Sequence, residues 1–285
     1  MKITKLKNKI IIDNPIDFNV VQTLNCGQIF RYVIDGNCAK VFSANKMAHL
    51  TFSANKIEIE TDNIEYFYEF FDLSTNYARI KNQLKKDSFL LPAVNFGYGI
   101  RILNNSLFEM LVSFIISANN NIARIKKSVK HLCEHFGTIC KTKLNNEEFT
   151  YNAFPTLEQL KTATVDDFKA AGLGYRAEQL HFTIQQLTQE QLCDLCKMTT
   201  RQQFKFLVSL KGVGEKVANC IMLFGLGVKS VFPVDTWINK VYNNLMGRQE
   251  TDRKKICLEL TARYGELSGY AQQYAFYYYR DNNFN

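Results

Sequence analysis

The sequence predicts an α+β protein in which an N-terminal antiparallel β-sheet domain packs on a mainly α-helical body. Between residues 9 and 62, short apolar runs alternate with turn residues, and Asp35-Gly36 between two such runs is a strong hairpin signal. From about residue 107 onwards, apolar residues recur with helical periodicity. The Gly-rich segment 96–99 connects the two patterns. We therefore expect a sheet domain over residues 1–95 and a helical region over residues 96–285.

The first pattern indicates about five strands, with an early helix over residues 18–24. The expected strands cover residues 10–12, 28–34, 38–43, 50–53 and 56–60. Two helices, over residues 64–72 and 77–84, complete the domain. The helices expected in the second half span residues 107–118, 122–136, 156–161, 165–171, 178–187, 201–210, 215–224, 236–244, 253–264 and 269–279.

The composition is that of a globular protein, with 46% hydrophobic and 22% charged residues in a chain of 285. No apolar stretch reaches the length of a membrane span, and the N-terminus lacks a signal-peptide core. A chain of this size does not need disulfides, so its eight cysteines indicate free thiols in a reducing compartment. We expect a cytoplasmic protein, associated with the nucleoid if the source is prokaryotic.

Positive charge is concentrated in one part of the chain. The formal net charge is +8, and residues 201–255 alone hold ten Lys or Arg against four Asp or Glu. Clustered cations are what a polyanion partner requires, although a charged stretch is also common on an ordinary solvated face. The charge alone therefore favours a nucleic-acid partner only weakly. Stronger evidence comes from a motif within residues 201–255 and from the residues that follow it.

That motif is Lys211-Gly212-Val213-Gly214, between two predicted helices. Gly212 and Gly214 let the backbone turn tightly and leave amide groups pointing outward at the positive end of the next helix. A phosphate can bind there without any base being read. An ordinary helix–helix turn has the same pattern, so the residues that follow carry the argument.

Lys216 and Asp235 are those residues. Lys216 lies in the first turn of the second helix, where the helix dipole and neighbouring lysines disfavour its charge, as a nucleophilic amine requires. Asp235 follows Pro233-Val234 and precedes the helix expected from residue 236, so it can cap that helix. We expect its carboxylate, held by backbone amides, to stay ionised and to stabilise a developing sugar cation. Each residue also has a plainer interpretation: Lys216 as a phosphate contact, and Asp235 as a simple helix cap.

No metal site is expected. Cys193 and Cys196 form a lone C-x-x-C pair without a second pair at zinc-ligand spacing, and two cysteines in a helical core are the simpler interpretation. His131 and His135 are four residues apart on a predicted helix but have no third ligand nearby.

Residues 207–242, with Leu-Lys-Gly-Val-Gly-Glu-Lys-Val-Ala and Pro-Val-Asp, resemble the helix-hairpin-helix, Gly/Pro-Asp superfamily of DNA glycosylases. Further blocks resemble its 8-oxoguanine DNA glycosylase branch: residues 26–31, 119–124, 172–177 and 271–276. The resemblance places the helix-hairpin-helix at 201–225 and a catalytic loop at 226–236. It implies a monomeric DNA glycosylase and AP lyase that excises 8-oxoguanine opposite cytosine from double-stranded DNA.

The resemblance also implies a role for each matching residue. Lys216 would attack the deoxyribose C1′, expel the base and form a Schiff base, with Asp235 stabilising the developing cation. The carbonyl of Gly27 would accept the N7–H that distinguishes 8-oxoguanine from guanine. In the base pocket, Phe276 would stack on one face of the extruded base, Cys220 would pack on the other, and Gln272 would bond its Watson–Crick edge.

Four residues match those that fill the vacated position in DNA and contact the orphaned cytosine: Asn119, Arg124, Tyr175 and Arg176. Animal members of the family have a His two residues after the catalytic Asp, where this chain has Trp237. Only Cys257 follows Asp235, so the cysteine cluster that holds an iron–sulfur cluster in the endonuclease III branch is missing. The family implies no required cofactor, and it allows a cation at the carbonyls of residues 211–214.

Two other functions stay open on the sequence. One is a related glycosylase for alkylated purines, against which Gly27 and the Gln272/Phe276 pair argue. The other is a non-catalytic DNA-binding protein that uses the hairpin only to hold phosphates.

Overall fold

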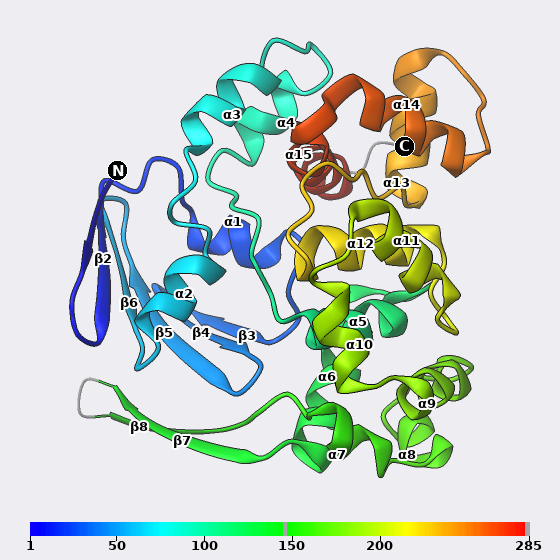
Figure 1. The fold of residues 1–285 in the computed structure, drawn as a ribbon. Coiled ribbons are helices and arrows are strands. Elements are labelled where there is room, and N and C mark those ends of the chain that lie inside the picture. The colour runs from blue at the N-terminus through cyan, green and yellow to red at the C-terminus, as the bar shows by residue number, and fades with distance from the viewer. Residues whose placement is uncertain (145–146, 283–285) are drawn as a thin grey trace.

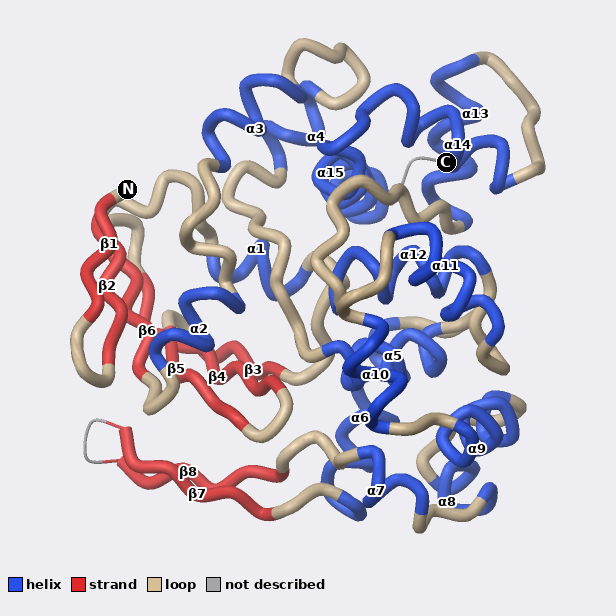
Figure 2. Tube along the Cα trace, in the orientation of Figure 1, coloured by secondary structure: helices blue, strands red, loops and turns tan. Residues whose placement is uncertain are grey.

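The computed structural model describes residues 1–144 and 147–282. Its N-terminal part holds a six-stranded antiparallel sheet in the order β1-β2-β6-β5-β4-β3 (Figures 1 and 2). The strands are β1 (Lys2–Lys5), β2 (Lys9–Asp13), β3 (Tyr32–Asp35), β4 (Cys38–Ser43), β5 (Lys46–Phe52) and β6 (Lys56–Glu60). The predicted N-terminal antiparallel sheet is therefore confirmed, with β1 as a strand that the sequence did not indicate.

One face of the sheet is apolar because side chains alternate along each strand. Ala39 and Val41 of β4 are buried, as are Ile57 and Ile59 of β6. Helices α1 (Val20–Asn25) and α2 (Ile64–Phe70) contribute Val20, Leu24, Phe67 and Phe70 to the same core. The Asp35-Gly36 hairpin turns between β3 and β4 as predicted, with Gly36 at φ +53.

The helical body begins with α3 (Tyr77–Leu84) and α4 (Leu91–Phe96) and is centred on α5 (Leu107–Ser117). Every residue of α5 from Glu109 to Ile116 is buried, and the helix packs against α6, α9 and α12. The remaining helices are α6 (Ile122–Phe136), α7 (Leu157–Lys161), α8 (Val165–Ala170), α9 (Arg176–Gln186), α10 (Gln189–Leu195), α11 (Thr200–Ser209), α12 (Glu215–Gly225), α13 (Thr236–Met246), α14 (Arg253–Tyr264), the short 3-10 helix η1 (Gly265–Leu267) and α15 (Ser268–Asp281).

Besides β1, α4 and η1, which the sequence did not indicate, the structure differs from the sequence-based expectations in three places. The strand expected over 28–34 begins only at Tyr32, because Gln28 is fully buried and bonds the backbone of 101–103 instead. A hairpin of β7 (Ile139–Leu144) and β8 (Glu147–Asn152) interrupts the helical half and projects beneath the sheet (Figure 1). Its strands are largely exposed, so they lack the apolar alternation that signals a strand.

The third difference concerns Cys193 and Cys196. Both lie at helix α10, which the sequence did not predict, and both are exposed instead of belonging to a helical core. All eight cysteines are free thiols. Among the described residues, no helix is long and apolar enough to cross a membrane.

Buried polar contacts fix the segment that follows α1 between the sheet and the helical body. The Gln28 side chain donates to the Arg101 carbonyl at 2.7 Å and accepts from the Leu103 amide at 2.8 Å. Arg31 lies 3.3 Å from the Glu109 carboxylate of α5, and both side chains are buried. Because Gln28 directly follows Gly27, and Arg31 follows three residues later, these contacts help to set the position of Gly27 relative to α5.

Candidate functional site: a lysine–aspartate pair in a small cavity

The turn between α11 and α12 is built around Gly212. Its φ of +82 lies in the left-handed region, and a Cβ there would be 3.0 Å from the Gln179 side chain. The Thr183 hydroxyl of α9 donates to the Lys211 carbonyl at 2.8 Å, which ties the turn to the body. The fold therefore requires a glycine at position 212.

Gly214 has a different status. Its φ of −87 is accessible to any residue, and a Cβ there would meet nothing within 4 Å. It is the N-cap of α12, which has no side-chain cap, so the first amides of that helix are open to a ligand. The fold itself does not demand glycine at this position, whereas the close approach of an anion does.

Lys216 lies in the first turn of α12, with Nζ 5.5 Å from the centre of the Phe114 ring. Cys220, one helical turn later, is buried on the same side of the helix. Burial raises the pKa of the Cys220 thiol, and the nearby Lys216 ammonium opposes that rise. The thiol is therefore a neutral packing group beside the lysine.

Asp235 is the N-cap of α13, and its Oδ1 accepts a 2.9 Å hydrogen bond from the Ile238 amide. Burial raises the pKa of this carboxyl above its ordinary value, although the Ile238 amide and the Lys216 ammonium work in the opposite direction. The backbone amide thus favours the ionised carboxylate, as expected from the helix cap, while desolvation opposes it. The same interactions place Asp235 and Lys216 within electrostatic reach of each other.

Lys216 and Asp235 line a small cavity together with residues from early and late parts of the sequence. Its volume is about 60 Å³. The residues that line it come from the loop after α1, from α5, α12 and α15, and from the segment before α13: Cys26, Gly27, Phe114, Lys216, Cys220, Phe224, Pro233, Asp235, Gln272, Gln273 and Phe276. All six residues predicted for catalysis and for the base pocket are among them.

Gly27 is held against α15 in this cavity. It has φ +84, and a Cβ there would lie 3.1 Å from the Phe276 ring, so no larger residue fits without movement. The Gln273 amide donates to the Cys26 carbonyl at 2.7 Å. Gln272 points its Oε1 into buried space, where it has no hydrogen-bond partner among the described residues. A buried acceptor without a partner is a natural contact point for a polar ligand.

A larger cleft of about 680 Å³ shares Gly27, Phe114, Lys216, Asp235 and Phe276 with the small cavity. It extends over residues 117–122, Trp237, Arg253 and Arg280. Asn119, exposed and at φ +48, belongs to this lining. The N-cap of α6 is Asn121, so Asn119 does not cap that helix.

Arg124, Tyr175 and Arg176 lie outside the described linings of both cavities. Arg124 and Tyr175 are exposed. Arg176 is buried, and its nitrogen atoms donate to the carbonyls of Leu173, Ala118 and Asn119. The side chain therefore holds the turn that carries Asn119, an arrangement that sequence reasoning did not anticipate.

Sequence reasoning also missed Phe114, Arg253, Gln273 and Arg280. Phe114 is one of many apolar residues on α5, so nothing singles it out. Arg280 could have been noticed, since it lies four residues after Phe276 on the same helix face.

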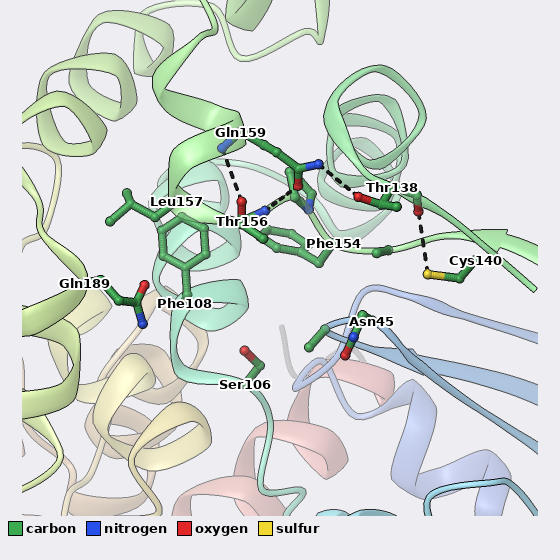
Figure 3. A pocket seen from close by; sticks show the side chains of 13 residues that line it. Asn45, Ser106, Phe108, Thr138, Cys140, Phe154, Thr156, Leu157, Gln159 and Gln189 are labelled. Atoms are coloured by element: carbon green, nitrogen blue, oxygen red, sulfur yellow. Dashed lines mark hydrogen bonds between the residues drawn. The ribbon is translucent and has the colours of Figure 1, made fainter.

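A separate cavity of about 440 Å³ lies between the base of the β7–β8 hairpin, α5 and α7 (Figure 3). Its lining side chains are neutral, including Asn45, Phe108, Phe154 and Gln159, and none was predicted as a site residue. Within the described residues, no group of three or more His, Cys, Asp or Glu is placed to hold a metal ion. His131 and His135 stack at 3.8 Å between ring centres.

Two family models together cover residues 10–265. Residues 112–265 match the HhH-GPD superfamily of base excision DNA repair proteins, and residues 10–111 match the N-terminal domain of 8-oxoguanine DNA glycosylases. The chain is 34% identical over 208 residues to an N-glycosylase/DNA lyase of Arabidopsis thaliana, a match over 67% of this chain and 55% of that protein. It is 30% identical over 239 residues to a probable N-glycosylase/DNA lyase of Methanothermobacter thermautotrophicus, covering 75% and 73% of the two chains.

Among solved structures, the fold matches the 8-oxoguanine glycosylase/lyase of Clostridium acetobutylicum, bound to double-stranded DNA with cytosine opposite 8-oxoguanine. The TM-score is 0.90, with 34% identity over 99% of both chains. The chain spans about half the length of the Arabidopsis relative but nearly the whole of the clostridial one. Because family models match its sheet domain and its helical body alike, the chain belongs to the 8-oxoguanine DNA glycosylase/lyase branch of the HhH-GPD superfamily.

Proposed function

We propose that this protein is a bifunctional DNA glycosylase and AP lyase that excises 8-oxoguanine opposite cytosine from double-stranded DNA. One observation carries the proposal: Lys216, Asp235, Gly27, Gln272 and Phe276 line a single cavity although they come from distant parts of the chain. A nucleophile, a carboxylate, a backbone acceptor and an aromatic face are the parts that such a reaction needs.

The substrate nucleotide leaves the DNA stack and enters the cavity from the larger cleft. Enzymes that act on a base within a duplex extrude it in this way, at a cost of a few kcal/mol. The cavity in the free protein, about 60 Å³, is far smaller than the ~300–1,000 Å³ of pockets that bury drug-sized ligands. It must therefore widen as the base enters, and the Phe276 ring that rests against Gly27 is the group best placed to move.

Chemistry then takes place at the sugar. The Lys216 amine forms a bond to C1′ as the N-glycosidic bond breaks. The base leaves with the bonding electron pair and takes up the proton that the newly bonded nitrogen gives up. Asp235 stabilises the positive charge that develops on the sugar. Ring opening gives an imine between C1′ and Nζ. Loss of a proton from C2′ then expels the 3′ phosphate and cuts the strand.

Discrimination against guanine rests on the backbone of Gly27. Guanine presents an acceptor at N7, whereas 8-oxoguanine presents N7–H, which a carbonyl can accept. The buried and unpartnered Oε1 of Gln272 supports a second contact, to a donor on the Watson–Crick edge.

The remaining residues hold the duplex. Gly212 and Gly214 present the amides of the hairpin to a phosphate, and Asn119 occupies the position vacated by the extruded base. Arg124 and Tyr175 read the orphaned cytosine. Arg176 supports these contacts by fixing the carbonyls of Ala118 and Asn119.

The proposed mechanism uses only side chains and backbone groups of the protein itself, so it requires no cofactor. A cation at the carbonyls of the 211–214 hairpin and a monomeric state remain predictions. Eight free thiols support a reducing, cytoplasmic location.

Borohydride trapping tests the central step. Wild-type protein should form a covalent adduct with an 8-oxoguanine duplex on addition of borohydride, and Lys216→Gln should form none. Lys205→Gln, on the exposed face of α11, is a matched control that should trap normally. Equal trapping by the Lys216 variant and the wild type would disprove the role of this lysine, and no adduct with the wild type would favour a DNA-binding protein without lyase activity.

Specificity for the excised base and specificity for the base opposite it need separate measurements. Excision of 8-oxoguanine should exceed excision of 3-methyladenine, and the opposite order would support a glycosylase for alkylated purines. Excision opposite cytosine should exceed excision opposite adenine, and Arg124→Ala should narrow that difference. Equal rates opposite all four bases would contradict the cytosine-reading role.

A further inference from the structure

Arg280, in the last turn of α15, has a donor that the protein leaves unused. Its Nη2 donates to the Asn25 carbonyl at 3.0 Å, and its Nε pairs with the Asp281 carboxylate at 2.6 Å. These two bonds fix the plane of the guanidinium. The third nitrogen, Nη1, is buried and has no hydrogen-bond partner among the described residues.

The unused donor faces the base pocket. Nη1 lies 3.6 Å from the position that a Cβ on Gly27 would take, and the guanidinium carbon lies 5.3 Å from the centre of the Phe276 ring. Arg280 also lines the large cleft, together with Gly27 and Phe276. The guanidinium therefore stands at the mouth of the pocket, beside the ring proposed to stack on the base.

The same helix face carries a second unused group. Gln272, Phe276 and Arg280 are spaced four residues apart and project from one side of α15. The Oε1 of Gln272 is an acceptor without a partner, and Nη1 of Arg280 is a donor without one. Each unpartnered buried group is unfavourable in the free protein and becomes favourable when a ligand supplies the complementary atom. An acceptor and a donor on either side of an aromatic ring suit a planar, polar ligand.

We propose that Arg280 is a further substrate-binding residue, whose Nη1 donates a hydrogen bond to an acceptor oxygen of the extruded nucleotide. This inference rests on the proposed function. Two oxygens have the required chemistry, one on the oxidised base and one on the adjoining phosphate. Both would gain a charge-assisted hydrogen bond from a guanidinium nitrogen that is already buried in the free protein.

Binding measurements in a Lys216→Gln background, which removes the proposed nucleophile, test the inference. Arg280→Met keeps much of the stem but removes the donor, and Arg280→Lys keeps the charge but loses the planar fork. Each would be compared on three duplexes: one with 8-oxoguanine, one with a tetrahydrofuran abasic analogue, and one undamaged. We expect Arg280→Met to weaken binding of the 8-oxoguanine duplex about tenfold, the loss of one charged hydrogen bond. Arg280→Lys should recover only part of that loss.

The abasic duplex separates the two oxygens. A loss confined to the 8-oxoguanine duplex assigns the contact to the base. A similar loss of affinity for both lesion duplexes assigns the contact to the phosphate if the slope of log binding constant against log salt concentration also decreases by about one. Unchanged binding of both lesion duplexes overturns the inference. The inference is also overturned if Arg280→Met weakens binding of both lesion duplexes equally, leaves the salt dependence unchanged and lowers the melting temperature of the protein. That combination would mean that Arg280 has a structural role.

Arg263→Met is the matched control. Arg263 also pairs with a carboxylate, that of Asp87, and lies against an aromatic ring, that of Tyr264, but it lines neither the cavity nor the cleft. It should leave binding of all three duplexes unchanged. Failure of the proposed function would appear separately, as a wild-type protein that neither excises 8-oxoguanine nor binds its duplex more tightly than undamaged DNA.

Discussion

The Gln273 side chain donates a 2.7 Å hydrogen bond to the carbonyl oxygen of Cys26, joining residues 247 positions apart in the chain. Gln273 is almost fully buried, as is Cys26. The bond lies between the residue that precedes Gly27 and the residue that follows Gln272. It therefore sets the distance between the two groups proposed to read the base.

Replacing Gln273 with Leu should reduce base excision more than it reduces strand cleavage. The Cys26 carbonyl would be left buried without this partner, at a cost of about 1–3 kcal/mol, and Gly27 would lose its register with α15. Single-turnover excision of 8-oxoguanine should fall, while cleavage of a preformed abasic site, which has no base to read, should change little. Gln185→Leu, an exposed residue on α9, serves as the control. Equal losses in both assays would contradict a role in base recognition.

Gly27→Ala should impair excision by strain and by steric blockage together. The backbone at φ +84 is unfavourable for alanine by roughly 1–2 kcal/mol, and the new Cβ would press on the Phe276 ring at 3.1 Å. Gly36→Ala isolates the first effect, because Gly36 also has positive φ but a Cβ there meets nothing within 4 Å. Thermal unfolding should show a loss for both variants, and excision assays a defect for Gly27→Ala alone. A similar activity for the two variants would mean that the space at Gly27 is unimportant.

The buried carboxyl of Asp235 predicts a distinctive dependence on pH. Burial raises its pKa in the folded protein above the ordinary value of 3.8, so the acid limb of the rate profile should lie above the range of an exposed aspartate. Asp235→Asn should lower excision by on the order of 10²–10³-fold, as the loss of one electrostatic contact to a transition state does.

The same pKa shift has a consequence for stability. A group whose pKa is raised on folding is destabilising when ionised, and this effect is relieved as the pH falls through the folded-state pKa. Asp235→Asn should therefore be more stable than the wild type at neutral pH, since the amide keeps the oxygen that accepts from Ile238. The difference should shrink as the pH is lowered, and urea unfolding at several pH values would measure it. A variant less stable than the wild type at neutral pH would show that the ionised form is favoured in the fold.

Arg176 and Tyr175 are adjacent but should respond differently to replacement by alanine. Arg176→Ala removes a buried guanidinium from three carbonyls and should cost about 2–4 kcal/mol of unfolding free energy. Tyr175→Ala, with 57% of the residue exposed, should change stability by no more than about 0.5 kcal/mol but weaken binding opposite cytosine. Urea unfolding and duplex binding measure the two effects. Comparable destabilisation by both variants would be the contrary result.

Local sequence patterns predicted much of this protein and failed where distant residues determine the outcome. The Asp35-Gly36 hairpin, the helices on either side of residues 210–214 and the cap at Asp235 follow from local patterns. The polar β7–β8 hairpin has no apolar alternation to reveal it. The direction of the Asp235 pKa shift depends on burial by the surrounding chain, which helix-capping rules do not contain.

In the candidate site too, some residues were predicted from the sequence, and others depend on contacts between distant parts of the chain. A resemblance over separated blocks named six residues for catalysis and the base pocket, and all six line one cavity in the structure. Arg176 and Gln273 act through carbonyls of other segments, so their partners could be found only once the chain was folded. Phe114 contacts Lys216 from a helix in which nearly every residue is apolar and buried.

The bond between Gln273 and Cys26 also has a consequence for biosynthesis. During translation the sheet domain, the hairpin and Lys216 leave the ribosome well before α15 does. The nascent chain can therefore contain the 211–214 turn and Lys216 before α15 has emerged, but Gly27 has no wall to face until that helix docks. The contacts proposed to read the base can therefore form only after α15 has been synthesised and has docked.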